Sequence, residues 1–105
     1  MILYNVTTKV ENSIHDEWLK WMQEVHILDV MKTGMFIENK LCRMLSNKEP
    51  DGVTYAVQYL CKDMKTIHEY EVKFSQPLRA AYKQKYEGKY VVFRSVMEVI
   101  STVEV

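Results

Sequence analysis

The order in which hydrophobic periodicities follow one another constrains the fold of this chain more than any other feature. Apolar and polar residues alternate over residues 2–10, and apolar residues at helical spacing follow over residues 13–32. Two extended runs then flank a turn signature at residues 47–52. A second helical spacing covers residues 63–87, and a last extended run covers residues 90–98. Because a period of two is typical of strands and a period of 3.6 of helices, the runs predict strand, helix, strand, strand, helix, strand.

This βαββαβ order predicts a ferredoxin-like α+β fold, in which an antiparallel sheet carries both helices on one face. With 105 residues the chain has a common length for one domain, so we expect a single ferredoxin-like domain over residues 1–105. A chain of this length buries roughly two-thirds of its unfolded surface, so it can fold without a disulfide or a structural metal.

The balance of charge argues against two kinds of partner. The 14 Lys and Arg residues equal the 14 Asp and Glu residues, so the formal net charge is zero. Proteins that bind nucleic acids or anionic membranes usually carry a strong positive field. RNA-recognition domains share this strand order, but their third strand needs a basic residue and exposed aromatics where this chain has Asp51 and Val53. We therefore expect neither nucleic acid nor a membrane as a partner.

The start of the chain indicates where the protein resides. The first residues turn polar at Asn5 without a preceding basic segment, which is unlike a secretory signal peptide. No apolar run in the sequence is long enough to span a bilayer. The sequence therefore favours a cytoplasmic protein.

The two cysteines, Cys42 and Cys61, are spaced for free thiols. If the extended runs at residues 41–45 and 53–59 pair as a hairpin, Cys42 lies opposite Ala56 and on the order of 15 Å from Cys61. A disulfide needs Cα atoms within about 7 Å of each other, so we expect both thiols to be reduced.

The histidines lack the spacing of a metal site. His15 and His26 share a face of the first helical run, but they are separated by about 16 Å along the helix axis. His68 belongs to the other helical run, and the seven methionines are better explained as core filler than as metal ligands. We therefore expect no metal and no cofactor.

Both helical runs carry an apolar stripe that should face the sheet, because its residues share one side of a 3.6-residue wheel. The stripes are Ile14, Trp18, Trp21, Met22, Val25 and Leu28 in the first helix and Ile67, Tyr70, Phe74, Leu78, Ala81 and Tyr82 in the second. We expect Trp21 to lie near the centre of the first stripe.

The ends of both helices carry typical capping residues. Asn12 or Ser13 can cap the first helix and Asp63 the second, because their side-chain oxygens accept hydrogen bonds from the first backbone N–H groups. Gly34 and Gly88 follow the two helical runs and can end them in a left-handed conformation.

Pro77 interrupts the second helical run. Proline removes a backbone donor and clashes with the preceding turn of a helix. We therefore expect a kink or a restart near residues 75–77, with Ser75 or Gln76 as the cap of the second half and Pro77 in its first turn.

The last strand carries apolar side chains on both of its faces, which are Val91, Phe93 and Met97 on one and Tyr90, Val92 and Val96 on the other. Two helices can cover only one side of the sheet, so the second side needs another cover, and the sheet of an identical chain is the simplest. We therefore expect a homodimer. Residues 99–105 are too apolar for a free tail and should extend the last strand or pair with the partner subunit.

Several segments carry a resemblance to a known family; they are residues 2–7 (ILYNVT), 15–22 (HDEWLKWM), 26–27 (HI), 33–36 (TGMF), 53–60 (VTYAVQYL), 78–80 (LRA) and 90–94 (YVVFR). The chain resembles a bacterial family catalogued as a domain of unknown function, family 4286, within the dimeric α+β barrel superfamily. Leu28 departs from the family pattern, in which proline is expected after His-Ile. The resemblance implies two ferredoxin-like protomers packed sheet against sheet, and it implies no activity or catalytic residue.

His26 is the first candidate for a functional side chain. It follows Trp18 and Met22 at helical spacing and lies at the rim of the apolar stripe. Related barrels hold ligands between the sheet and the helices, where a histidine can act as a general base or a hydrogen-bond donor. The alternative is a half-buried structural histidine that caps nearby backbone groups.

Tyr4, Tyr55 and Arg94 are further residues that could line such a cleft. The tyrosines could point their hydroxyls into it, or they could be core aromatics whose polar ends reach water or backbone. Arg94, like Arg79, could pair with a ligand carboxylate or form a structural ion pair.

The sequence contains no nucleophile constellation, phosphate-binding loop or dinucleotide fingerprint. Two function classes therefore stay open. One is a binding or structural dimer with a possible small-molecule ligand. The other, implied by the superfamily, is a small cofactor-independent enzyme of the monooxygenase or cyclase kind. An enclosed cleft with polar groups near His26 favours the enzyme, and a tightly packed interior favours the structural dimer.

Overall fold

The structure is a computed structural model that describes residues 1–46 and 49–105. Its elements in chain order are β1 (Ile2–Glu11), a 3-10 turn η1 (Asn12–Ile14), α1 (His15–Trp21), a π-helical segment η2 (Met22–His26), α2 (Ile27–Lys32), β2 (Glu38–Arg43), β3 (Gly52–Cys61), α3 (Met64–Lys73), α4 (Ser75–Tyr86) and β4 (Tyr90–Glu98). The predicted βαββαβ order is confirmed. Part of the predicted turn, at residues 47–48, lies outside the described residues, and its last part forms a turn at Pro50 and Asp51.

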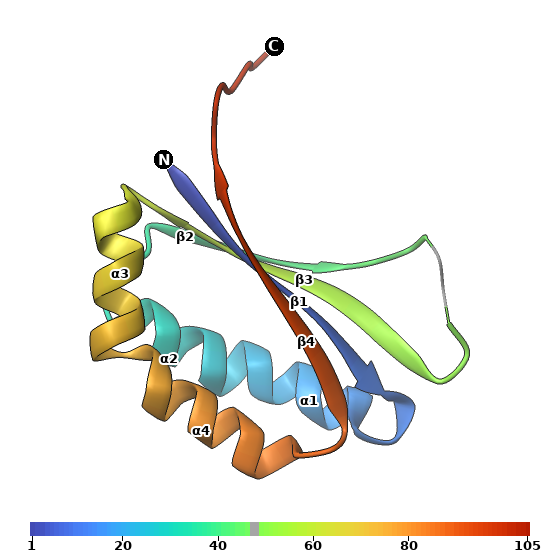
Figure 1. Ribbon diagram of the computed structural model, residues 1–105. Coiled ribbons are helices and arrows are strands. Elements are labelled where there is room, and N and C mark those ends of the chain that lie inside the picture. Colours follow the sequence, from blue (N-terminus) through green and yellow to red (C-terminus); the bar gives the residue numbers. More distant parts are fainter. Residues whose placement is uncertain (47–48) are drawn as a thin grey trace.

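The strands form an antiparallel sheet in the order β2-β3-β1-β4, and all helices lie on one side of it (Figure 1). This is the ferredoxin-like arrangement that the periodicities predict. The predicted hairpin register is also confirmed, because Cys42 pairs with Ala56. Both cysteines are free, with Cys42 exposed and Cys61 buried.

The core lies between the helices and the inner face of the sheet. The largest side chains that are fully buried are those of Trp18, Tyr55, Val10, Val30 and Val57. Burial of each large apolar side chain contributes about 1.5–3 kcal/mol, so this layer is the main source of stability. Trp21 is only half-buried and lies beside this core, so Trp18 occupies the central position expected for Trp21.

The first helical run is less regular than its periodicity predicts. Val25 and Leu28, expected in the core, are exposed, whereas Ile27 and Val30 are buried. The cause is the π-helical segment η2, whose hydrogen bonds skip one additional residue. One extra residue turns the following helix by about 100°, so the predicted stripe leaves the core after Met22.

The predicted N-cap of this first helix is wrong. The structure shows no side-chain cap at η1 or α1. The Asn12 amide instead donates a hydrogen bond to the carbonyl oxygen of Pro50 at 2.8 Å, which ties the start of the helix to the turn before β3. A contact with a distant loop therefore replaces the local cap.

The second helical run breaks where the proline predicts. The backbone leaves helical geometry at Phe74, with φ of −125°, and Pro77 lies in the first turn of α4. The expected cap by Ser75 or Gln76 is wrong, because the Ser75 hydroxyl donates to the carbonyl oxygen of Glu71 at 2.8 Å. The cap of α3 is confirmed, since the Asp63 side chain accepts a hydrogen bond from the Thr66 N–H at 2.9 Å.

The apolar stripe of the second helical run differs from the prediction at its end. Ile67 and Tyr70 are buried as expected, but Ala81 is exposed and Tyr86 takes part in the core. Gly34 and Gly88 both have φ of 78°, as their predicted roles at helix ends require.

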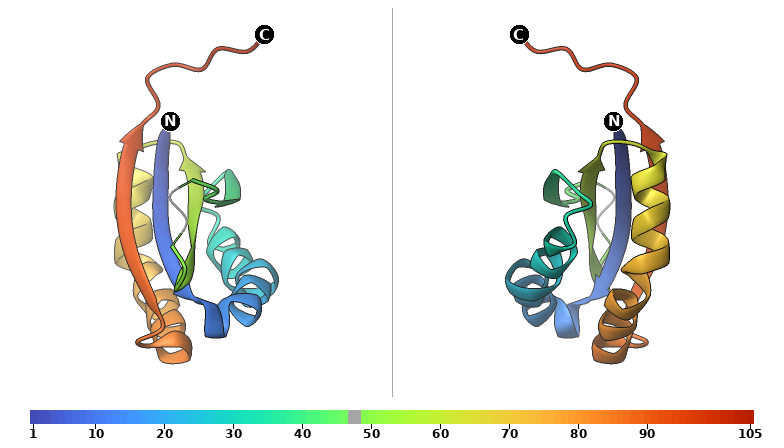
Figure 2. Two further views of the ribbon diagram at one scale, coloured as in Figure 1. Left: turned by 90° about the vertical axis from the view of Figure 1, so that its right-hand side faces the viewer. Right: turned by 90° about the vertical axis from the view of Figure 1, so that its left-hand side faces the viewer.

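The C-terminal residues leave the sheet. The N–H of Val99 donates to the carbonyl oxygen of Met1 at 3.0 Å, and the chain beyond it has no regular structure. Residues 100–105 project away from the body of the protomer (Figure 2). The expectation that this tail extends β4 is therefore wrong beyond Val99, and its pairing with a partner subunit stays a prediction.

Candidate functional site

His26 lies at the end of the π-helical segment η2 and faces the space between the helices and the sheet. Its ring stacks on that of Trp21, with centroids 5.0 Å apart, and it meets the edge of Tyr82 at 5.3 Å. Met22 and His26 both line this space, as their helical spacing predicts. π-Helical segments of this kind are often found at functional sites.

A narrow cavity of about 40 Å³ runs between α2, α4 and the inner face of the sheet. Its polar lining residues are Tyr4, Thr8, His26, Tyr59, Tyr70, Arg79 and Tyr82, and its apolar ones include Met22, Val30 and Leu78. A cavity of this size has room for a few water molecules, whereas most small-molecule sites measure about 300–1,000 Å³. The interior therefore brings polar groups together near His26 but leaves little space between them.

Burial determines the protonation of the groups around this cavity. Desolvation lowers the pKa of His26 to about 4, with a nearby Asp29 opposing the shift and Arg94 adding to it. Burial also raises the pKa of Tyr70 to about 12 and raises the pKa of Tyr59. At neutral pH the cavity therefore contains a neutral imidazole and protonated phenols, which can exchange hydrogen bonds with a polar ligand.

Arg79 supplies the positive charge of the cavity lining. Its Nη2 donates to the Tyr4 hydroxyl at 2.9 Å and to Glu71 Oε1 at 2.6 Å. Sequence reasoning considered Arg79 only as a pairing residue, and its position in the lining depends on the break at Phe74, which orients α4. Of the residues predicted to line a cleft, Tyr4 and His26 thus share one cavity.

Arg94 and Tyr55 lie outside that lining. Arg94 projects from β4, opposite Val6, and is exposed, although its charge contributes to the lowered pKa of His26. Tyr55 is buried near the start of α1, where its ring packs on Trp18 with centroids 4.9 Å apart.

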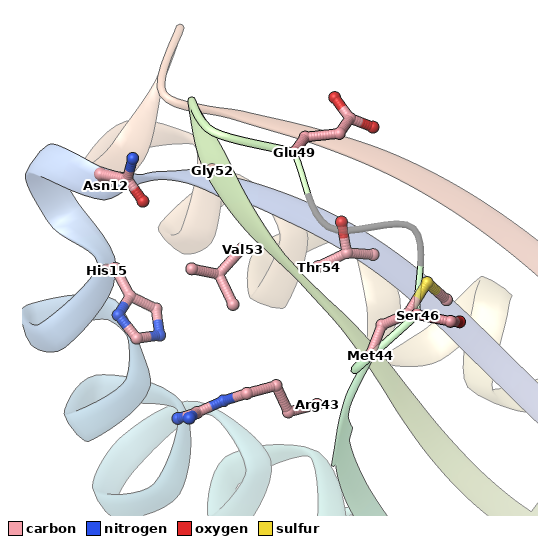
Figure 3. A pocket seen from close by; sticks show the side chains of 9 residues that line it. All are labelled: Asn12, His15, Arg43, Met44, Ser46, Glu49, Gly52, Val53 and Thr54. Carbon is pink, nitrogen blue, oxygen red and sulfur yellow. The ribbon is translucent and has the colours of Figure 1, made fainter.

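A second, wider hollow of about 290 Å³ lies between the start of α1, the end of β2 and the start of β3 (Figure 3). His15 and Arg43 line it, and both contact the hydroxyl of Tyr55. His15 Nε2 lies 2.6 Å from this oxygen, and Arg43 Nε donates to it at 3.0 Å. Sequence reasoning did not identify this cluster, because its members are separated along the chain by 12 and 40 residues.

In the parts of the chain that the structure describes, no three His, Cys, Asp or Glu side chains come together as a metal site. The same parts contain no helix with the length and hydropathy of a membrane span.

The sheet order, the helical layer and the cavity between them define a ferredoxin-like α+β protein. The chain belongs to the family described as a domain of unknown function (DUF4286), which matches residues 1–100. The resemblance noted in the sequence is thereby confirmed. No curated protein matches the chain in sequence.

Solved structures that resemble the chain share its fold over nearly the full length. A Bacillus cereus protein described as a candidate antibiotic biosynthesis monooxygenase has a TM-score of 0.69 and 13% identity, covering 99% of this chain and 97% of its own. A dimeric ferredoxin-like protein from an uncultured marine organism has a TM-score of 0.70 and 12% identity, covering 99% of each chain. The heme-degrader MhuD from Mycobacterium tuberculosis, described with two hemes in its active site, has a TM-score of 0.69 and 14% identity, covering 99% and 100%.

Proposed function

We propose that this chain, as a single domain over residues 1–105, forms a homodimer through the open face of its sheet and acts as a binding or structural dimer. The observation that carries the proposal is the exposure of large apolar side chains on the outer face of β4. Val91 is 70% exposed and Phe93 is 68% exposed. A soluble chain rarely leaves neighbouring apolar side chains uncovered on a regular strand without a partner for them.

The outer face continues across the sheet with residues that are only half-buried. Phe93 is paired with Thr7, and Met97 is paired with Leu3, which in turn faces Leu60 on β3. These side chains share the outer face because alternate residues of a strand point the same way. A sheet-to-sheet contact of two such faces would bury them together, and a stable interface needs about 1,200 Å² or more in total. The marine relative is described as dimeric, which supports the same assembly here.

The C-terminal tail adds to this proposal. Ile100 and Val103 are each more than 80% exposed, at 82% and 86%. An extended apolar segment that leaves its own sheet gains most by lying on a second subunit, where its backbone and side chains find partners. We include pairing of residues 99–105 with the partner subunit in the proposed dimer, which we place in the cytoplasm.

Light scattering on the purified protein tests the dimer. Wild type at micromolar concentration should show about twice the mass of one chain. Phe93→Asp should give a folded monomer, because a carboxylate on the outer face cannot be buried against a second sheet. Val72→Asp is the matched control, since Val72 is exposed to the same degree, 69%, but lies on α3 on the other side of the sheet. A monomeric wild type, or equal effects of the two changes, would refute the proposal.

The polar lining at His26 favours a second candidate, a small-molecule enzyme that works without a cofactor. A neutral imidazole could take a proton from a substrate that Arg79 orients. The cavity of about 40 Å³ is far below the size of a heme, so the chain in this conformation does not fit the ligand of the mycobacterial relative. A smaller substrate would require α4 to move away from the sheet.

A thermal-shift screen of metabolites on wild type and His26→Ala distinguishes the two candidates. An enzyme should give hits with wild type that the variant loses while it remains dimeric. Hits of equal size with both proteins would remove His26 from any site, and an absence of hits would leave the structural dimer as the better description.

A further inference from the structure

The hollow at the start of α1 is separate from the cavity at His26, since the two share no described lining residue. Its volume of about 290 Å³ is near the lower end of small-molecule sites. Among its lining residues Arg43 carries a positive charge, and His15 lies beside it (Figure 3). This hollow therefore combines space with donors, which the interior cavity does not.

Arg43 is held in place by Tyr55. Its Nε donates to the Tyr55 hydroxyl, and its Cζ lies 5.5 Å from the centroid of the same ring. Tyr55 is only 2% exposed, so it provides a rigid support. The Nε contact uses one corner of the guanidinium and leaves the two terminal amino groups for another acceptor.

His15 completes a chain of hydrogen bonds behind Arg43. Its Nε2 contacts the Tyr55 hydroxyl, and its Nδ1 lies 3.2 Å from Asp16 Oδ1. If the Tyr55 hydroxyl accepts from Arg43, it donates its own proton to His15 Nε2. This contact orients the imidazole at the wall of the hollow, where Figure 3 shows it.

The positive charge of Arg43 is not balanced by a paired carboxylate among the described residues around the hollow. Within the described residues, no carboxylate lies at ion-pair distance from Arg43. Glu49, which also lines the hollow, is paired with Lys9. Asp16 contacts His15 and is otherwise fully exposed. A planar guanidinium without a counter-ion, held by the Tyr55 hydroxyl, matches the geometry of a carboxylate or a phosphate.

We propose that this hollow binds a small oxyanion, a carboxylate or a phosphate group, with the terminal amino groups of Arg43 as its charged donors. Tyr55 and His15 are positioning residues, because they hold the guanidinium and do not need to touch the anion themselves. The proposal does not depend on the cavity at His26 or on the dimer.

Nuclear magnetic resonance titration tests this site on the full-length protein. Sodium phosphate and sodium acetate are added in separate series at constant ionic strength, and the ring nitrogens of His15 and the backbone amides of residues 43–46 and 52–54 are followed. Saturable shifts confined to these groups are expected with at least one anion, and the better of the two series identifies phosphate or carboxylate as the preferred chemistry.

Variants assign the binding to Arg43. Arg43→Gln should weaken binding by at least about tenfold, the scale of losing one charge-assisted hydrogen bond. Lys40→Gln is the control, because it removes the same charge from the same strand at a position facing the outer side of the sheet. If Arg43→Gln does not fold, Arg43→Lys is the second variant. It keeps the charge but loses the planar arrangement of several N–H donors, so it should weaken binding several-fold. Equal titrations of wild type and the Arg43 variant, or shifts that rise linearly without saturation, would overturn the proposal.

Discussion

At the scale of single residues, His26 and Trp21 form one unit. The imidazole stacks on the indole, and both meet the edge of Tyr82, with the indole 5.5 Å and the imidazole 5.3 Å from its centroid. Aromatic pairs of this kind contribute about 0.5–1.5 kcal/mol beyond the burial of their area. The half-buried position of Trp21 therefore does not make it a surface residue, because its ring packs against His26, Tyr82 and Tyr86.

Replacement of Trp21 by alanine should destabilise the protein by about 3 kcal/mol, the lower end of the range for a buried aromatic residue. Trp18→Ala should cost more, because Trp18 is fully buried and its Nε1 donates to the Tyr82 hydroxyl at 2.6 Å. Urea denaturation of both variants provides the measurement. A Trp21→Ala midpoint equal to that of wild type would show that Trp21 packs on the surface.

The lowered pKa of His26 makes stability depend on pH. The imidazole has a pKa near 6.5 when unfolded and about 4 in the fold, so the unfolded chain binds the extra proton between these values. The contribution of the neutral imidazole to the free energy of unfolding is fully present above pH 6.5 and is lost as the pH falls toward 4. The loss is roughly 3 kcal/mol at most.

Comparison with His26→Gln isolates this contribution from His15 and His68. Denaturation midpoints are measured between pH 7.5 and 4 for both proteins, and wild type should lose more stability than the variant on acidification. Parallel curves would mean that His26 is as accessible to protons in the fold as in the unfolded chain.

At the scale of elements, the π-helical segment η2 determines which residues of the first helical run face the core. Trp18 in α1 and Met22 at the start of η2 are buried, and after η2 Ile27 and Val30 take their place. A regular helix would have placed Val25 and Leu28 there. The segment therefore behaves as a one-residue insertion that turns α2 relative to α1.

Deletion of one residue tests this interpretation. Removing Glu24 from η2 should let α1 continue into α2 as a regular helix and keep Ile27 and Val30 in the core, so that thermal unfolding changes little. Removing Leu28, an exposed residue of α2, should turn Val30 out of the core and lower the melting temperature by several degrees. Circular dichroism melting curves compare the two deletions, and a greater loss for the Glu24 deletion would contradict the insertion model.

At the scale of the whole molecule, the open sheet face and the C-terminal tail are the features that one chain leaves unsatisfied. The helices cover the inner face of the sheet, whereas the outer face and residues 100–105 remain in solvent (Figure 2). In the proposed homodimer both find a partner in the second copy.

Deletion of residues 99–105 should weaken the dimer without unfolding the protomer, because the tail makes only one backbone contact with its own sheet, from Val99 to Met1. Sedimentation or light scattering over a dilution series measures the dissociation, and circular dichroism confirms the fold of the truncated chain. An unchanged dissociation constant would mean that the tail remains exposed to solvent in the dimer as well.

Local features of the sequence were enough to predict most of the fold. The alternation of residues 2–10 and the helical spacing of residues 63–87 determine their own elements, because periodicity acts within a few residues. Gly34 and Gly88 end helices because their backbone adopts positive φ at no steric cost. Pro77 marks the start of a new helix because proline has a fixed φ and no backbone N–H, which suits only the first turn of a helix. The pairing of Cys42 with Ala56 also followed from counting along a hairpin.

The candidate sites were decided by the tertiary structure. Leu28 faces solvent and Val30 the core because the helical hydrogen bonds shift at η2, and no pattern in the segment predicts this shift. Tyr55 meets His15 and Arg43, and Arg79 meets Tyr4, through side-chain contacts between residues far apart in the chain. The sequence by itself therefore determined the elements and their order, and only the packed fold determined which polar groups come together, because their contacts depend on the geometry between elements and not on spacing within one.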